Sequence, residues 1–171
     1  IITDGGWWKV ALNKIKLDGL CIELGVYQGR SINFFAHHKP NITWYGFDSF
    51  HGFKEDWMGG FFSEGEYSTD GQLPKVNNNV RLIKGFFKDT LPNFLKEKKQ
   101  NISFLHVDCD TYEIISSKRF VTNTIILFDE YISYVGWEHG EFKAWKEFVK
   151  KNNIKYKYEM FGLRQALVRI L

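Results

Sequence analysis

The chain has 171 residues, of which 44% are hydrophobic and 25% are charged, which is the composition of one ordinary globular domain. A net charge of +3 that is spread along the sequence argues against nucleic acid as a partner. No apolar run approaches the ~20 residues needed to cross a bilayer and no signal peptide is visible, so we expect a cytoplasmic protein without a membrane partner.

The hydrophobic pattern predicts helices and strands that alternate along the chain. We expect α-helices at residues 9–15, 29–38, 89–98 and 141–151, the third with Pro92 in its first turn. We expect β-strands at residues 19–24, 42–48, 80–85, 102–110, 124–130, 155–160 and 165–170, the last two joined as a hairpin. Alternating strands and helices predict an α/β fold with a mostly parallel sheet and helices on both faces.

Two intervals do not fit this alternation. Residues 53–72 form a long irregular stretch, which indicates either a lid or binding loop, or disorder. Only 13 residues separate Asp110 from Thr124, which is barely enough for a crossover helix. We therefore expect a shortened helix there, or residues missing from the sequence. Cys21 and Cys109 both fall in predicted buried strands, which disfavours a disulfide framework and fits a reducing compartment.

Two neighbouring predicted strands end in carboxylates. Asp108 and Asp110 end the strand that starts at Ile102, and Asp129 and Glu130 end the strand that starts at Thr124. The carboxyl ends of parallel strands meet at one edge of a sheet, where α/β proteins bind ligands. Four like charges there would repel one another unless a cation or a proton holds them together. The sequence therefore predicts a hard-metal site or an acid/base site at this edge.

A glycine-containing turn follows the first predicted strand, in the sequence Glu23-Leu-Gly25-Val-Tyr-Gln-Gly29-Arg-Ser31. Glycines allow a ligand to approach the backbone, and the next helix presents N–H groups at its start. The second strand ends in Asp48, which is placed to accept hydrogen bonds from a ribose diol. Together these features predict a cofactor that carries a nucleoside.

Five motifs in order resemble one enzyme family: Glu23-x-Gly25-x-x-x-Gly29, Gly46-Phe-Asp48-Ser-Phe-His-Gly52, Gly85-Phe-Phe-Lys-Asp-Thr-Leu-Pro92, His106-Val-Asp-Cys-Asp110-Thr-Tyr-Glu113 and Phe128-Asp-Glu-Tyr131. The chain is similar to the macrocin O-methyltransferase (TylF/MycF-like) family of class I S-adenosylmethionine-dependent enzymes. This resemblance implies a Rossmann-like, seven-stranded sheet of order 3-2-1-4-5-7-6 with strand 7 antiparallel. It also implies a divalent cation, usually Mg²⁺, methyl transfer to a sugar hydroxyl of a small molecule, and a possible homo-oligomer.

The resemblance also implies a role for each motif residue. The residues expected to line the cofactor are Glu23, Leu24, Gly25, Val26, Tyr27 and Ser31 at the methionine part, Asp48 and Ser49 at the ribose, Gly85 and Phe86 at the adenine, and Asp108. The expected metal ligands are Asp108, Asp129 and Glu130, with Glu130 standing where relatives often have Asp. Asp110 is the expected general base. One domain would span residues 1–171 and lack an amino-terminal lid and part of the helix after the fourth strand.

The chemistry of the expected reaction supports these roles. A sugar hydroxyl has a pKa far above 7, so that methyl transfer needs a base and benefits from a cation that binds the acceptor's oxygens. His106 shares a strand face with Asp108, and we expect it to be a hydrogen-bonded core residue rather than a ligand. His51 and His139 are expected on solvated loops.

Two other interpretations remain open. Asp108-Cys-Asp110 also matches the D-x-D of metal-dependent glycosyltransferases, a weak motif that the glycine turn and the second acidic pair disfavour. The chain could instead be a catalytically inactive cofactor-binding protein, which the retention of four carboxylates disfavours.

Overall fold

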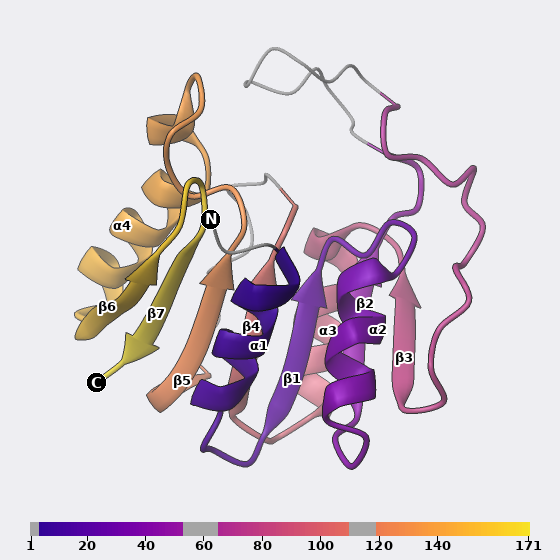
Figure 1. Ribbon diagram of the computed structural model, residues 1–171, viewed down its shortest axis with the longest axis horizontal. Helices are drawn as coiled ribbons and strands as arrows, with labels where there is room; N and C mark the ends of the chain where they lie inside the picture. The colour runs from indigo at the N-terminus through magenta and orange to yellow at the C-terminus, as the bar shows by residue number, and fades with distance from the viewer. Residues whose placement is uncertain (1–3, 53–64, 110–118) are drawn as a thin grey trace.

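A computed structural model describes residues 4–52, 65–109 and 119–171 of the chain. Its centre is a seven-stranded sheet of order β3-β2-β1-β4-β5-β7-β6 (Figure 1). The strands are β1 (Leu20–Leu24), β2 (Trp44–Asp48), β3 (Val80–Lys84), β4 (Ile102–Val107), β5 (Phe120–Phe128), β6 (Tyr156–Phe161) and β7 (Ala166–Ile170). All pairings are parallel except those of β7 with β5 and β6. The predicted Rossmann-like methyltransferase sheet is confirmed.

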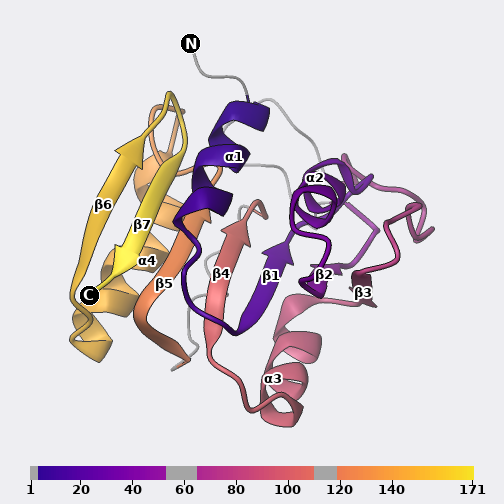
Figure 2. The same ribbon diagram turned by 60° about the horizontal axis from the view of Figure 1, so that its bottom comes forward.

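Helices cover both faces of this sheet (Figure 2). The helices α1 (Asp4–Lys14) and α2 (Arg30–His38) pack on one face, in a core that includes Trp8, Phe35 and Trp44. The helices α3 (Phe87–Glu97) and α4 (Glu141–Asn152) pack on the other, where Trp145 and Phe128 are fully buried. A short 3-10 helix, η2 (Trp137–His139), precedes α4. None of the helices in the described segments is long and apolar enough to span a bilayer.

Some expected boundaries were wrong. The helix α3 begins at Phe87, because the turn at Gly85, with φ of 139°, ends β3 and lets the carbonyl of Phe86 accept the N–H of Thr90 at 3.0 Å. Pro92 therefore lies inside this helix and not in its first turn. Cys109 lies beyond the end of β4 and is half-buried, whereas Cys21 is buried in β1 as expected. The expected crossover helix and most of the expected lid loop lie outside the described residues.

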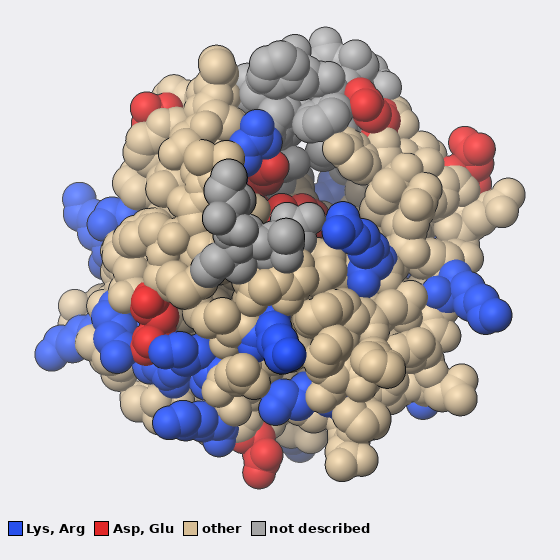
Figure 3. All heavy atoms as spheres, viewed as in Figure 1, with Lys and Arg blue, Asp and Glu red and all other residues tan. Residues whose placement is uncertain are grey.

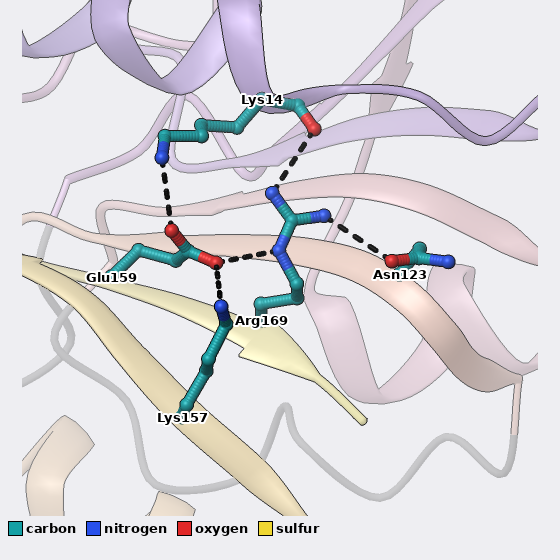
Figure 4. A network of polar contacts seen from close by, with 5 residues as sticks. All are labelled: Lys14, Asn123, Lys157, Glu159 and Arg169. Carbon is teal, nitrogen blue, oxygen red and sulfur yellow. Dashed lines mark hydrogen bonds and ion pairs between the residues drawn. The ribbon is translucent and has the colours of Figure 1, made fainter.

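An ionic network of side chains joins α1 to the strands β6 and β7 (Figure 4). The Glu159 carboxylate lies 2.6 Å from Nε of Arg169, 2.9 Å from Nζ of Lys14 and 3.0 Å from Nζ of Lys157. The Arg169 guanidinium also donates to the side chain of Asn123 at 3.4 Å. One carboxylate thus joins three cationic side chains from three elements.

The carboxyl ends of β1, β2, β4 and β5 lie at the upper edge of the sheet in Figure 1. Because β7 runs antiparallel to β5, its first residue, Ala166, pairs with Phe128, the last residue of β5. The turn between β6 and β7 consequently lies at the same edge, close to Asp129 and Glu130.

Candidate active site

The turn after β1 requires glycine at position 25. Gly25 has a φ of 88°, and a Cβ atom there would overlap the backbone carbonyl of Asp108. The N–H of Asp108 donates to the carbonyl of Leu24 at 2.9 Å, and the N–H of Gly25 donates to that of Phe47 at 3.0 Å. The turn is therefore seated between the ends of β2 and β4.

Asp48 orders two backbone turns. Its Oδ2 accepts the N–H groups of Val26 at 2.8 Å and Tyr27 at 2.7 Å, and its Oδ1 accepts the N–H of Phe50 at 2.7 Å. Since a carboxylate oxygen can accept two hydrogen bonds, Oδ1 keeps capacity for a further donor. The predicted contact of Asp48 with a ribose stays a prediction, but the residue already couples the turn after β1 to the turn after β2.

Glu23 forms a fully buried pair with His106. Its Oε2 lies 2.9 Å from Nδ1 of His106, and its Oε1 accepts the Ser31 hydroxyl at 3.0 Å. Burial raises the pKa of Glu23, although the hydrogen bond from His106 opposes this. Burial lowers the pKa of His106, but the hydrogen bond and charge of Glu23, with the charges of Asp108 and Asp129, outweigh it and raise the pKa to about 8. The expected hydrogen-bonded core histidine is confirmed.

Several expected cofactor residues are enclosed by protein atoms. The side chains of Glu23, Leu24 and Val26 are buried, so a cofactor could reach Leu24 and Val26 only at the backbone. Tyr27 is half-buried in the same turn, with a φ of 50°. Of the two residues expected near the adenine, Phe86 is 37% exposed, and Gly85 donates its N–H to the carbonyl of Asp48. Ser49 is half-buried beside Asp48.

The acidic residues lie at the ends of β4 and β5. Asp108 is exposed, and Asp129 and Glu130 are half-buried. The negative charges of both Asp108 and Asp129 help to raise the pKa of His106. Asp110, the expected base, lies outside the described residues. Figure 3 shows acidic side chains in a hollow at this edge, with basic side chains beside them.

The turn between β6 and β7 adds two residues to the site that the motifs did not indicate. Nη1 of Arg164 contacts both carboxylate oxygens of Glu130, and Nε2 of Gln165 donates to Oδ1 of Asp129 at 3.4 Å. The expected strand order could have predicted this position. A hairpin whose second strand pairs antiparallel with β5 must place its turn at the edge where Asp129 and Glu130 lie.

Hard carboxylate oxygens are the donors that divalent cations prefer, and Asp108 and Asp129 supply them from neighbouring strands. The chemistry of these two donors fits such an ion. Within the described segments, however, no three His, Cys, Asp or Glu side chains are grouped closely enough to hold one. Glu130, the expected third ligand, is instead paired with Arg164.

His51 and His139 are both exposed, as expected, but His139 is the last residue of the 3-10 helix η2 and does not lie on a loop.

Residues 22–137 match the family model for a methyltransferase domain, which covers the chain from β1 to η2. The chain belongs to this family. It is therefore an S-adenosylmethionine-dependent methyltransferase. The family match is broader than the macrocin O-methyltransferase family that the motifs resemble.

Solved methyltransferases share the fold of this family member. The calicheamicin methyltransferase CalS11 is 19% identical, with a TM-score of 0.76 over 97% of this chain and 78% of that one. The apo structure of CalS11, described as a TDP-rhamnose 3'-O-methyltransferase, has a TM-score of 0.68 at the same identity and coverage. The S-adenosylhomocysteine-bound methyltransferase PaMTH1 of Podospora anserina is 14% identical, with a TM-score of 0.61 over 98% of this chain and 77% of that one. No curated protein sequence matches the chain.

Proposed function

We propose that this methyltransferase transfers the methyl group of S-adenosylmethionine to a hydroxyl of a sugar or glycosylated small molecule, with a divalent cation, as macrocin O-methyltransferases do. The observation that carries the proposal is the pair Asp108 and Asp129, which follow the neighbouring strands β4 and β5, with Asp108 directly against the glycine turn. The description of CalS11 as a TDP-rhamnose O-methyltransferase supports a sugar acceptor.

The cofactor would lie along the carboxyl ends of β1, β2 and β3. The backbone of the turn at Gly25–Tyr27 would contact its methionine part, held in place by Asp48. The remaining hydrogen-bonding capacity of Asp48 and the Ser49 hydroxyl would face the ribose, and Phe86 would offer an exposed aromatic ring to the adenine. The sulfonium methyl needs no activation beyond alignment with the acceptor oxygen.

The acceptor hydroxyl must lose its proton as the methyl group transfers. In our proposal the carboxylate of Asp110 accepts that proton, as a general base. Asp108, Asp129 and Glu130 would hold a divalent cation, usually Mg²⁺, which when bound orients the acceptor oxygens and lowers the pKa of the reacting hydroxyl. Asp129 is oriented by Gln165, a residue from a different element.

Two measurements test this proposal. Calorimetry with S-adenosylhomocysteine reports cofactor binding, and transfer of labelled methyl to nucleotide sugars and neutral glycosides, with and without Mg²⁺, reports the reaction. We expect Asp110→Asn to lower turnover by about 10²–10⁴-fold, the usual contribution of general-base catalysis. Asp18→Asn is the matched control, because Asp18 is exposed before the amino end of β1.

Cofactor binding without methyl transfer to any sugar would favour the catalytically inactive interpretation. Binding of a nucleotide sugar in place of S-adenosylhomocysteine would favour glycosyl transfer. Equal turnover with Mg²⁺ and with a chelator would remove the cation from the proposal and leave methyl transfer standing.

A further inference from the structure

Arg164 joins the β6–β7 turn to the segment that follows β5. Its backbone carbonyl accepts the N–H groups of Tyr131 at 2.8 Å and Ile132 at 3.1 Å. Its guanidinium pairs with the carboxylate of Glu130. Three contacts from one residue therefore fix the position of an expected metal ligand.

The geometry of the ion pair bears on cation binding. Nη1 of Arg164 is 3.1 Å from Oε1 and 3.3 Å from Oε2 of Glu130, so it is almost equidistant from the two oxygens. A nitrogen in that position lies between the oxygens, where a cation held by both of them would also have to lie. The guanidinium and a bidentate cation thus cannot occupy the carboxylate together.

The ion pair of Arg164 and Glu130 is also exposed enough for a cation to displace the guanidinium. The side chain of Arg164 is 38% exposed and that of Glu130 is 18% exposed. Ion pairs near the surface contribute at most about 1 kcal/mol, so a divalent ion can displace the guanidinium at a modest cost. None of the described Lys and Arg side chains forms an ion pair with Asp129. Its carboxylate accepts a hydrogen bond from the neutral amide of Gln165 instead.

We propose that Arg164 competes with the divalent cation for Glu130 and holds this carboxylate in the cation-free state. The proposal rests on the cation of the proposed function. Cation binding then requires Glu130 to leave Arg164, which couples occupancy of the site to the β6–β7 turn.

The competition is tested by isothermal titration calorimetry of the full chain with Mg²⁺ and with Mn²⁺, without substrate. Removing the guanidinium removes both the competitor and a positive charge next to the ion, so we expect Arg164→Gln to bind the cation about tenfold more tightly than wild type. Arg164→Lys keeps the charge and should lie between them. In a Glu130→Gln background, the same Arg164→Gln change should raise affinity by much less than tenfold, because the competed carboxylate is gone and only the removal of the nearby positive charge remains.

Arg81→Gln is the control for the change in net charge, because Arg81 is exposed on β3, at the other end of the sheet order. It should leave cation affinity unchanged, and circular dichroism verifies that each variant is folded. Cation binding that is unchanged, weaker or absent in both Arg164 variants would overturn the proposal. So would a tenfold gain that persists in the Glu130→Gln background. Methyl transfer is measured separately, so that failure of this competition leaves the proposed reaction untouched.

Discussion

Replacing Glu159 by glutamine should destabilise the fold by removing the carboxylate that joins α1 to the hairpin of β6 and β7 (Figure 4). The hydrogen bond from Arg169 is the main reason that the pKa of Glu159 falls from 4.5 to about 2, and Lys14 adds to it. The Glu159 side chain is only 10% exposed and that of Arg169 is 11% exposed. Glutamine keeps the shape of the side chain but leaves the Arg169 charge without its anionic partner.

The pKa shift sets the size of this effect. At about 1.4 kcal/mol per pKa unit, a fall from 4.5 to about 2 is worth about 3 kcal/mol of stability. Two of the partners are lysines that are 39% and 54% exposed, and solvent screening of their charges reduces the expected loss to about 2–3 kcal/mol. Urea unfolding at pH 7 measures the loss as a difference in the free energy of unfolding.

The pH dependence gives an independent check. Because the folded-state pKa of Glu159 is lowered, its contribution is complete above pH ~4.5 and disappears as the pH falls towards 2. The stabilities of wild type and Glu159→Gln should therefore converge, with more than half of the difference lost at about pH 3. Glu147→Gln, at an exposed position on α4, is the control. A difference below about 0.5 kcal/mol at pH 7, or one that stays constant down to pH 3, would refute the reasoning.

Two further variants test the glycine turn and the buried pair beneath it. Gly25→Ala should abolish measurable S-adenosylhomocysteine binding by calorimetry and lower the melting temperature, because the new Cβ would overlap the carbonyl of Asp108 at a left-handed φ; wild-type binding in this variant would contradict the account. Glu23→Ala should cost about 3–5 kcal/mol of stability in urea unfolding, because it leaves His106 buried without its partner, and a loss below about 1 kcal/mol would show that the pair is not needed.

The sequence alone predicted the succession of strands and helices along the chain, the glycine turn after the first strand, and the acidic residues at two strand ends. These predictions depend on local patterns, because a short apolar run followed by Asp108 or Asp129 indicates a buried strand and its end. Parallel strands share one carboxyl edge, which was enough to bring both acids together before any contact was known. The resemblance supplied the strand order, and with it the place of the final hairpin.

Only the tertiary structure decided the partners of these residues. Glu23 and His106 are 83 positions apart, and Glu130 and Arg164 are 34 apart, so that no local pattern relates them. Their contacts depend on strand register and on the direction of each side chain, which are set when the whole sheet assembles. The sequence could thus place an acidic residue at the end of a strand. The partner of that residue depends on which elements pack next to it in the folded sheet.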